Sequence, residues 1–376
     1  MAQKRRKLLP LIRHFSNIPD PRIDRKKRHL LTDIIAITIC AIICGADEWT
    51  EIALFGKAKE EWFKTFLELP NGIPSHDTFA RLFARLNPDG FRECFLRWVD
   101  CVREKTSGEV VAIDGKTLRS SFDKASSKAA IHMVSAWSSK NNCVLGQVKV
   151  DAKSNEITAV PKLLELIELS GCIVTMDAMG CQKEHALAII NKEADYIFSL
   201  KGNQGLFHEE VKTFFEYALE SHFEEVPHQY LEKTEKDHGR IESRRCWLLT
   251  DLKYFEKAKE WPGIRGVGMI ESTRRIEGKE TKEIRIYCTS LRDVKTFSRG
   301  IRQHWQVENN LHWVLDVAFR EDKCRIRKDN APENFAMLRH IALNLLKKET
   351  SCKNGIKAKR LKAGWDEQYL LSVLLA

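Results

Sequence analysis

The hydrophobic pattern of the chain changes near residue 109, and this change constrains the fold more than any other feature. Residues 1–105 carry apolar residues at helical spacing, whereas the next hundred residues alternate short apolar runs with amphipathic segments. The runs predict strands at 110–114, 129–137, 143–150, 171–177 and 196–200, with helices at 157–169 and 182–192. Three strands followed by two helix–strand units predict an α/β fold with a mixed sheet flanked by helices.

The chain length indicates several folding units, because 376 residues exceed what one hydrophobic core usually organises. We expect an N-terminal all-helical domain at 1–105 and the first part of an α/β core at 106–204. Residues 205–292 are predicted to be an inserted β-rich subdomain, with an acidic helix at 205–235 and strands at 243–249, 267–273 and 283–289. Residues 293–376 are predicted to complete the core with helices, at about 297–315 and 332–348, and to include a basic C-terminal region.

The N-terminal region contains a pair of helical segments with a short turn between them. Residues 31–44 are apolar on nearly every side, which predicts a buried central helix. The pair follows at 51–67 and 75–86, and Ser75 is expected to cap the second helix by accepting hydrogen bonds from its first amides. Arg81 and Arg85 share the exposed face of that helix. The pattern fits either a helix-turn-helix that contacts DNA through these arginines or an ordinary helical hairpin with solvated arginines.

Positive charge is concentrated at the two ends of the chain. The formal net charge is +10, yet residues 1–30 contribute +8 and residues 320–362 another +8, which leaves −6 for the rest. Such blocks favour a polyanion, either nucleic acid or an anionic membrane surface. No membrane span is expected, because the longest apolar stretch, at 34–44, is much shorter than the roughly 20 residues required. Eleven cysteines without a CxxC pair, mostly in apolar runs, favour a reducing, cytoplasmic location.

Two aspartates stand where predicted strands end. Asp114 follows the apolar residues 110–113, and Asp177 follows 173–176. Strand ends in α/β sheets are where ligands meet side chains held by a rigid scaffold, and an aspartate there is costly to desolvate unless a cation or several donors bind it. Taken singly, each aspartate fits the cap of a turn or of the next helix better than a metal ligand. Their parallel placement favours metal ligands.

Glu308 is the third acid, on a predicted helix that also carries His304 and His312. The spacing of four residues places the three side chains roughly one above another, and Glu308 is expected to point inward beside tryptophans. A buried carboxylate requires a counter-charge, which a divalent ion shared with Asp114 and Asp177 would provide. Three carboxylates suit Mg²⁺ or Mn²⁺, and two such ions can catalyse phosphoryl transfer. A zinc site built from the two histidines is the weaker alternative, because they lie two turns apart.

Several motifs make the chain resemble the H-repeat-associated proteins, a family of insertion-sequence transposases of the DDE type. The motifs are Ile18-Pro-Asp-Pro-Arg22, Ile113-Asp-Gly-Lys-Thr-Leu-Arg119, Met176-Asp-Ala-Met-Gly-Cys-Gln182, Leu200-Lys-Gly-Asn-Gln204 and Arg302-Gln-His-Trp-Gln-Val-Glu-Asn-Asn-Leu-His-Trp313. The resemblance covers essentially the whole chain. It implies a ribonuclease-H-like catalytic core, a catalytic and metal-binding triad of Asp114, Asp177 and Glu308, and an insertion at 205–292.

The last motif departs from the pattern Tyr-x2-Arg-x3-Glu-x6-Lys that related DDE transposases often carry. The corresponding positions are Ile301, His304, Glu308 and Leu315, so Arg302 and His304 are the candidates for the lost phosphate contacts. Four further residues flank the strand ends and are either DNA contacts or solvated surface: Lys116, Arg119, Lys201 and Asn203. A basic patch after the third acid is the stronger candidate and comprises Lys323, Arg325, Arg327 and Lys328. Trp247 fits a core position better than base stacking.

These features together predict a Mg²⁺-dependent DNA transposase, with Mn²⁺ as a substitute and two ions at the site. Its partners are expected to be double-stranded DNA, as transposon ends and target, and further copies of the chain in a homodimer or larger assembly. Two alternatives remain: a catalytically inactive or regulatory DNA-binding remnant, and a nuclease without strand transfer.

Overall fold

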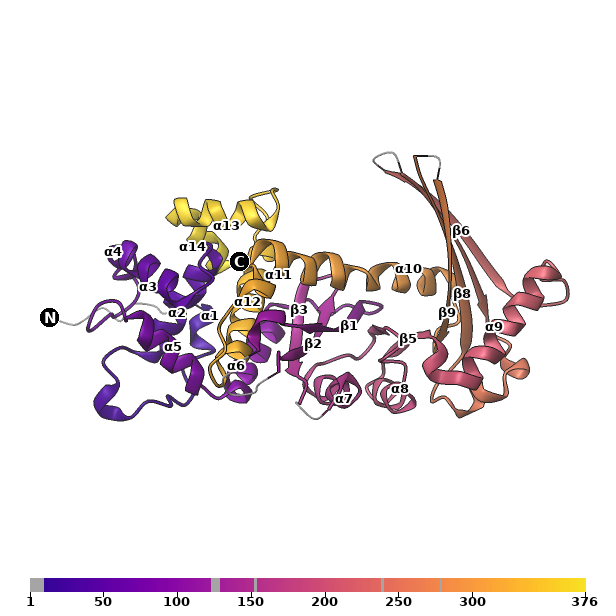
Figure 1. The fold of residues 1–376 in the computed structure, drawn as a ribbon, viewed down its shortest axis with the longest axis horizontal. Helices are drawn as coiled ribbons and strands as arrows, with labels where there is room; N and C mark the ends of the chain where they lie inside the picture. Colours follow the sequence, from indigo (N-terminus) through magenta and orange to yellow (C-terminus); the bar gives the residue numbers. More distant parts are fainter. Residues whose placement is uncertain (1–9, 123–128, 152–153, 238–239, 278) are drawn as a thin grey trace.

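The computed structural model describes residues 10–122, 129–151, 154–237, 240–277 and 279–376. The first nine residues, which carry part of the positive charge of residues 1–30, lie outside this part. The N-terminal region is helical, as predicted (Figure 1). Its helices are α1 (Pro10–Arg13), α2 (Leu31–Ile43), α3 (Trp49–Ala58), α4 (Glu60–Phe63), α5 (His76–Arg85) and α6 (Pro88–Val102).

Helix α2 is the buried centre of this region, which confirms the prediction for residues 31–44. Every residue from Asp33 to Ile43 is buried. Three C-terminal helices pack against α2, namely α12 (Ala331–Lys348), α13 (Ile356–Trp365) and α14 (Glu367–Leu375). The two ends of the chain therefore share one hydrophobic core (Figure 1).

Helix α5 has the amphipathic character that its sequence predicts. Phe79, Leu82 and Phe83 are buried, whereas Arg81 and Arg85 are exposed. Ser75 occupies the N-cap position, but its hydroxyl contacts the Thr78 hydroxyl at 3.1 Å. The expected hydrogen bonds from the backbone amides of the first turn to Ser75 are therefore wrong, because the Ser75 hydroxyl contacts the Thr78 hydroxyl instead.

One nine-stranded mixed sheet runs through the rest of the molecule. Its strand order is β3-β2-β1-β4-β5-β9-β8-β7-β6, and β1 pairs in parallel with β4, as β4 does with β5, while the other neighbours are antiparallel. The mixed α/β architecture is confirmed. The first five strands are β1 (Val110–Thr117), β2 (His132–Ser138), β3 (Cys143–Lys149), β4 (Ile173–Met176) and β5 (Asp195–Leu200).

Helices cover both faces of the five-stranded part of the sheet. Helix α7 (Glu156–Leu166) packs against β2 and β3, and α8 (Lys183–Ile190) packs against β5. Helix α10 (Val294–His304) crosses the opposite face, over β1, β4 and β5 (Figure 1). After α10 the chain continues through a π-helical turn, Val307–His312, into α11 (Trp313–Ala318).

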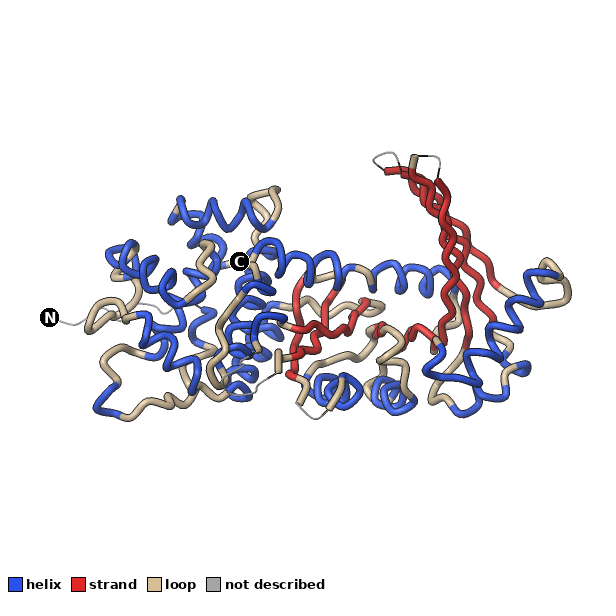
Figure 2. The backbone as a smooth tube through the Cα atoms, in the orientation of Figure 1, coloured by secondary structure: helices blue, strands red, loops and turns tan. Residues whose placement is uncertain are grey.

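The segment 205–292 continues the same sheet. Helix α9 (Gly205–Glu220) precedes four long strands, and the last of these pairs with β5. Figure 2 shows the four strands extending together well past the helical layers. They are β6 (Gln229–Asp237), β7 (Arg240–Leu249), β8 (Gly266–Ile276) and β9 (Lys279–Thr289).

Two sequence interpretations in this segment have different outcomes. The helix predicted to reach residue 235 is wrong, because residues 229–235 belong to β6. This edge strand is largely exposed and lacks the apolar alternation that identifies a half-buried strand. Trp247 is a core residue, since its side chain is buried and its ring stacks on Phe223 at a centroid distance of 5.8 Å.

Gly300 permits the close approach of α10 to the sheet. A Cβ atom at this position would collide with the Cδ1 atom of Ile197 on β5 and would touch Ile173 on β4. We therefore expect Gly300→Val to lower the free energy of unfolding by about 2 kcal/mol, because overpacking forces the helix away from the strands. Urea unfolding followed by circular dichroism measures the change. Gly202→Ala is the control, since nothing lies within 4 Å of its Cβ position; an equal loss in both variants would contradict this prediction.

Within the described ranges, no helix is both long enough and apolar enough to cross a membrane. The eleven cysteines are free thiols, and most of them are buried.

Candidate active site

The parallel pairing of β1 with β4 brings the two aspartates together. Ile113 lies opposite Met176 in the register of this pair, so the next residues, Asp114 within β1 and Asp177 just after β4, lie at the same level of adjacent strands. Both side chains line a cleft of about 360 Å³, which Glu308 also lines. Three acids spread over nearly two hundred residues of sequence therefore border one cleft.

The two aspartates bond differently to neighbouring backbone. The Oδ1 atom of Asp177 accepts hydrogen bonds from the amides of Met179 (3.0 Å) and Gly180 (3.3 Å), so it caps the turn after β4. The Oδ1 atom of Asp114 accepts one from the amide of Gly115 at 2.9 Å. The prediction that Asp114 ends its strand is wrong, because β1 continues to Thr117 through its pairing with β2.

Glu308 lies in the π-helical turn and is more exposed than its sequence suggests. Its side chain is 58% exposed, and Trp305 and Trp313 are 40% and 60% exposed. The prediction of an inward carboxylate buried beside tryptophans is therefore wrong. The prediction assigned side chains to the faces of a regular α-helix. The wider π-helical turn rotates every residue after Gln306 relative to that regular helix.

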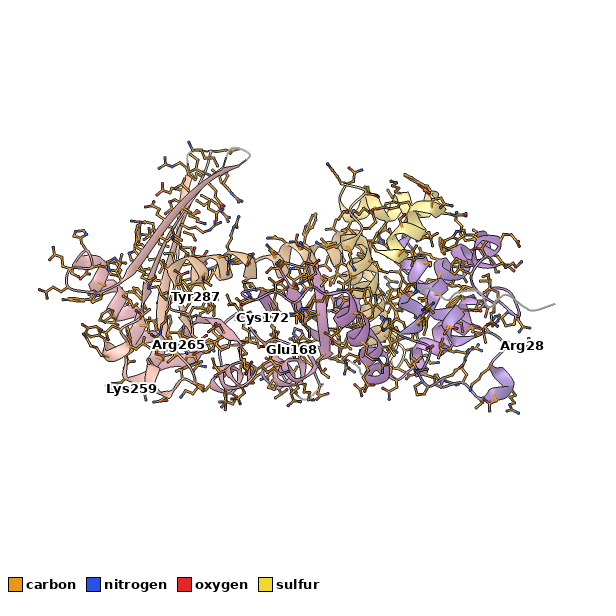
Figure 3. The ribbon with its side chains drawn as sticks, turned by 180° about the vertical axis from the view of Figure 1, so that it is seen from behind. Arg28, Glu168, Cys172, Lys259, Arg265 and Tyr287 are labelled. Atoms are coloured by element: carbon orange, nitrogen blue, oxygen red, sulfur yellow. The ribbon has the colours of Figure 1, made fainter. Side chains whose placement is uncertain are left out.

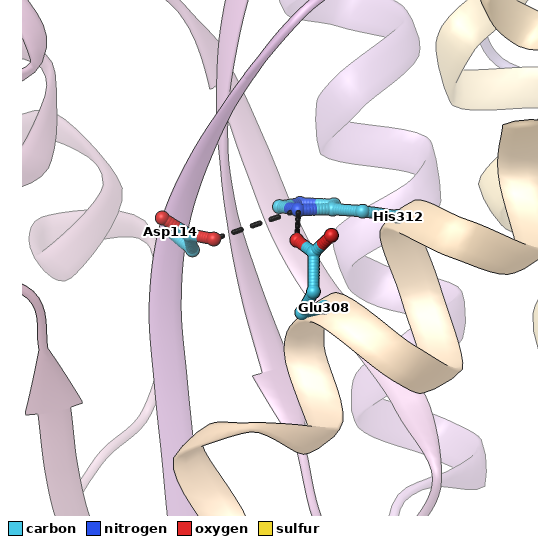
Figure 4. Close-up of side chains that lie close together, drawn as sticks. All are labelled: Asp114, Glu308 and His312. Carbon is cyan, nitrogen blue, oxygen red and sulfur yellow. Dashed lines mark hydrogen bonds and ion pairs between the residues drawn. The ribbon is translucent and has the colours of Figure 1, made fainter. Parts of the chain in front are cut away.

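His312 lies beside Glu308, as their spacing of four residues predicts. Its Nδ1 atom lies 3.5 Å from Asp114 Oδ2 and 3.3 Å from Glu308 Oε2 (Figure 4). One ligand atom from each of these three residues falls within 4.8 Å of the others, so the group could hold a metal ion. His304 instead has its Nδ1 atom 2.9 Å from the Thr175 hydroxyl. The sequence pattern therefore pairs His312 with Glu308 but does not indicate its approach to Asp114.

The electrostatics of Asp114 favour a bound cation. Burial raises the pKa of this carboxyl to about 7, and the like charges of Asp177, Glu156 and Glu308 add to the effect. Burial also lowers the pKa of His312 and lowers that of His304 to about 4, so both imidazoles are neutral at pH 7. Carboxylate oxygens beside a neutral imidazole form a donor set that fits a divalent cation.

Lys116 forms a buried network beneath the site. Its ammonium group lies 2.7 Å from Asp316, 3.1 Å from Asp322 and 3.8 Å from Glu321. Glu321 is buried and also lies 3.7 Å from the buried guanidinium of Arg339. The network joins β1, just beyond Asp114, to the segment that follows Glu308. Lys116 therefore has three carboxylate partners in this structure.

The other basic and polar residues of the catalytic region differ in how freely they can meet DNA. Lys201 is exposed at the rim of the cleft, and the Asn203 amide donates to the carbonyl of Ala178 at 2.7 Å. Arg119 is 81% exposed, with its Nε atom 3.3 Å from Asp322. Arg302 is half exposed and lies 3.2 Å from Glu235.

The basic patch after the third acid faces the N-terminal helical region. Arg325, Arg327 and Lys328 line a second cleft, of about 600 Å³, together with His76 and Ala80 from the α5 end of that region. The Nε atom of Arg327 donates to the carbonyl of Ser120 at 2.9 Å. The basic patch and helix α5, which the sequence suggests separately as regions of DNA contact, therefore border one cavity.

Strand β9 and helix α10 both line the first cleft. Tyr287 of β9 lines this cleft, and its ring packs edge-on against Phe297 of α10 at a centroid distance of 5.8 Å. Figure 3 shows Tyr287 from behind, at the base of the extended strands. The strands of segment 205–292 therefore contribute directly to the cavity that contains the acids.

Comparisons with known proteins agree with these features. The family descriptions DDE_Tnp_1-associated and Transposase DDE domain match residues 12–99 and 105–345. The chain is 42% identical over 370 residues to "Putative transposase YncI" of Escherichia coli O157:H7, covering 97% of this chain and 94% of the relative. It is 41% identical over 374 residues to "H repeat-associated putative transposase YhhI" of Escherichia coli (strain K12), covering 98% of each.

One solved structure has a weak overall similarity, a piggyBac transposase synaptic complex with hairpin DNA. The TM-score is 0.45 at 11% sequence identity, over 94% of this chain and 76% of that chain, and this similarity is too low to support an inference. The two relatives, in contrast, span nearly the full sequence, and the Transposase DDE domain match covers more than half of it. The chain belongs to the DDE transposase family, with relatives among the H-repeat-associated putative transposases.

Proposed function

We propose that this protein is a DNA transposase that binds the ends of an insertion sequence and catalyses metal-dependent strand cleavage and strand transfer. The observation that carries the proposal is the meeting of Asp114, Asp177 and Glu308 at one cleft. DDE transposase domains generally use divalent metal ions, and the donor atoms here fit one. An antiparallel meander of β1, β2 and β3 followed by the parallel strands β4 and β5 supports a ribonuclease-H-like core.

The three acids have distinct tasks in this proposal. Asp114 and Asp177 would hold the cations, which we propose to be two Mg²⁺ ions with Mn²⁺ as a substitute, from neighbouring strands of the sheet. Glu308 reaches the same cations from the solvent side of the cleft, where its exposed carboxylate can also orient an attacking hydroxyl group. When bound, the cations lower the pKa of the attacking group and neutralise charge on the leaving oxygen of the phosphodiester.

DNA would be held by exposed basic residues around the two clefts. We assign this role to Lys201, Arg119, Arg302 and Asn203 near the acids, to Arg325, Arg327 and Lys328 at the second cleft, and to Arg81 and Arg85 on α5. Lys116 is left out because it is mostly buried among three carboxylates, and His304 because its ring bonds to Thr175 inside the cleft. Pairing two transposon ends would require at least a homodimer, and a DNA-acting enzyme of this kind would work in the cytoplasm.

Two DNA assays test the proposal and separate its alternatives. Duplex DNA that carries the ends of the element should be nicked in the presence of Mg²⁺ or Mn²⁺, and the exposed 3′-hydroxyl should then join to target DNA. Binding without nicking would identify a regulatory remnant. Nicking without joining would identify a nuclease.

The basic patch should contribute to the salt dependence of DNA binding. We expect Arg325→Ala and Lys328→Ala each to reduce the slope of log K against log salt concentration by about 0.9, because each removes one phosphate contact. Fluorescence anisotropy with labelled end DNA at several salt concentrations measures the slope. Lys259→Ala is the control: this exposed lysine lies at the far end of the molecule and pairs with Glu256 (Figure 3). If the control changes the slope as much as the two variants do, the assignment of the patch is wrong.

A further inference from the structure

His312 is buried against the acids of the site, and none of the features described so far requires an imidazole there. We infer that its Nδ1 atom is a metal ligand, so that one cation is held by Asp114, Glu308 and His312. This inference rests on the proposed function and adds a nitrogen ligand to a site that the three acids alone would make all-oxygen.

The distances from His312 Nδ1 to the two carboxylates are close to those between ligands of a single ion, and the three ligand atoms lie within 4.8 Å of one another. Two ligand atoms that each lie about 2.1 Å from an ion, at angles of 90° to 110°, are about 3.0–3.4 Å apart. Nδ1 of His312 lies 3.3 Å from Glu308 Oε2 and 3.5 Å from Asp114 Oδ2. The arrangement therefore needs only a small contraction to enclose a cation.

The same separations are long for direct hydrogen bonds. An N–H donor that bonds to a carboxylate usually approaches to about 2.7–2.9 Å, and the His132–Glu156 pair beside this site reaches 2.6 Å. His312 approaches neither of its two carboxylates so closely. The contact with Glu308 is thus a long hydrogen bond, and two carboxylates that converge on one ring nitrogen at these distances fit ligands arranged around an ion.

The other side of the ring is suited to this role. His312 is only 6% exposed, and its Nε2 atom makes no hydrogen bond with any residue that the structure describes. His312 also lines a small internal cavity of about 10 Å³ together with Gln147 and His340. The Gln147 amide and the His340 Nδ1 atom likewise lack partners among the described residues.

This cavity has room for about one water molecule and offers it several polar partners. Ligating histidines usually donate the proton of their second ring nitrogen to a carbonyl, a carboxylate or water. A proton on Nε2, directed toward this polar cavity, leaves the lone pair of Nδ1 free for the cation. The surroundings of the ring therefore select the tautomer that a ligand requires.

A nitrogen ligand changes which cation the site prefers. Imidazole binds Mn²⁺ and later transition metals more readily than Mg²⁺, which favours oxygen ligands. We expect His312→Asn to weaken Mn²⁺ binding by about tenfold or more and to change Mg²⁺ binding much less. The Asn side chain can place an amide oxygen near the former Nδ1 position, so the variant converts the site to oxygen ligands with little change in volume.

Electron spin-echo spectroscopy of Mn²⁺ bound to the full chain tests the inference without DNA or turnover. The wild-type protein should show modulation from a directly bound histidine nitrogen, and growth with ¹⁵N-histidine should convert this modulation to that of ¹⁵N. The isotope exchange requires no substitution, so it is independent of any folding defect. The modulation should be lost in His312→Asn and retained in His304→Asn, a matched change of a histidine that lines the same cleft but bonds to Thr175.

Each other outcome has a definite meaning. Mn²⁺ binding that depends on Asp114 but shows no histidine modulation overturns the inference and leaves the proposed function standing. Modulation that persists in His312→Asn also overturns it. If Asp114→Asn leaves Mn²⁺ binding unchanged, the cation site itself is wrong, and both the inference and the proposed mechanism fail.

Discussion

Asp114→Asn is expected to lower the rate of strand cleavage at transposon ends by about 10³-fold or more, while the affinity for end DNA changes by less than about threefold. The amide keeps the shape of the side chain but removes the negative charge that holds the cation, and with it stabilisation of the transition state worth about 4 kcal/mol. Metal-dependent nicking of end DNA and a binding isotherm without metal measure the two quantities. Asp151→Asn, which changes an exposed aspartate paired with Lys162, is the matched control and should cleave normally.

The same substitution should stabilise the protein when no divalent cation is present. Burial and neighbouring acids raise the pKa of Asp114 to about 7 in the folded state, above its unfolded value of 3.8. Ionisation of this group therefore opposes folding, and the cost is absent below about pH 4, grows up to pH 7 and is constant above it. Three pKa units correspond to at most about 4 kcal/mol.

Thermal unfolding in the presence of a chelator measures this effect. At pH 8 the Asp114→Asn variant should melt at a higher temperature than the wild type, and the difference should shrink toward pH 4. Added Mg²⁺ or Mn²⁺ should raise the melting temperature of the wild type alone. A variant that melts lower at pH 8 would show that the cleft does not concentrate negative charge on Asp114.

Lys116→Met is expected to lower the free energy of unfolding by about 3 kcal/mol, because it leaves the carboxylates of Asp316, Glu321 and Asp322 without their shared cation. Its neighbours raise the pKa of Lys116 above the ordinary 10.5 despite an opposing effect of burial. A cation with a raised pKa stabilises the folded state fully below pH 10.5 and loses this contribution at higher pH. The whole effect should therefore be visible at pH 7 in urea unfolding.

Lys201→Met provides the comparison, since this lysine is exposed at the cleft. We expect its unfolding free energy to stay within about 0.5 kcal/mol of the wild type, while its affinity for end DNA falls. Folded Lys116→Met should bind end DNA like the wild type. Reversed results, with stability lost at Lys201 and DNA affinity lost at Lys116, would mean that the roles of the two lysines had been exchanged.

The parts of the fold that could be predicted from the sequence are those with strong apolar periodicity. Strands β1, β4 and β5 are short apolar runs buried on both faces, and α2 is apolar all round, so pattern alone identifies them. Strand β6 could not be identified in this way, because an exposed edge strand needs no apolar face. The pairing of β9 with β5 is also invisible to local patterns, since it depends on contacts about ninety residues apart.

The candidate active site could also be predicted from the sequence only in part. Asp177 follows from a strand end, and Asp114 from the apolar run before it, although β1 continues to Thr117; parallel pairing then brings the two together. The position of Glu308 at the cleft follows from the family resemblance and its contact with His312 from their spacing of four residues, but the exposure of Glu308 does not. This exposure depends on the π-helical turn, which the residue spacing does not indicate. A change of winding that arises from tertiary packing cannot be derived from residue spacing.

That turn also determines which single-codon deletions the site would tolerate. A π-helical turn accommodates one residue more than regular winding, so deleting a single codon there would let the helix relax into uniform α-helical form and keep α10 and α11 nearly in phase. The same deletion within the regular winding of α10 would instead swing the side chains on one side by about 100° relative to the other, which would turn Glu308 and His312 away from Asp114. The irregular turn is therefore the one place in this helix where the gene could lose a codon and the acids could still face one another.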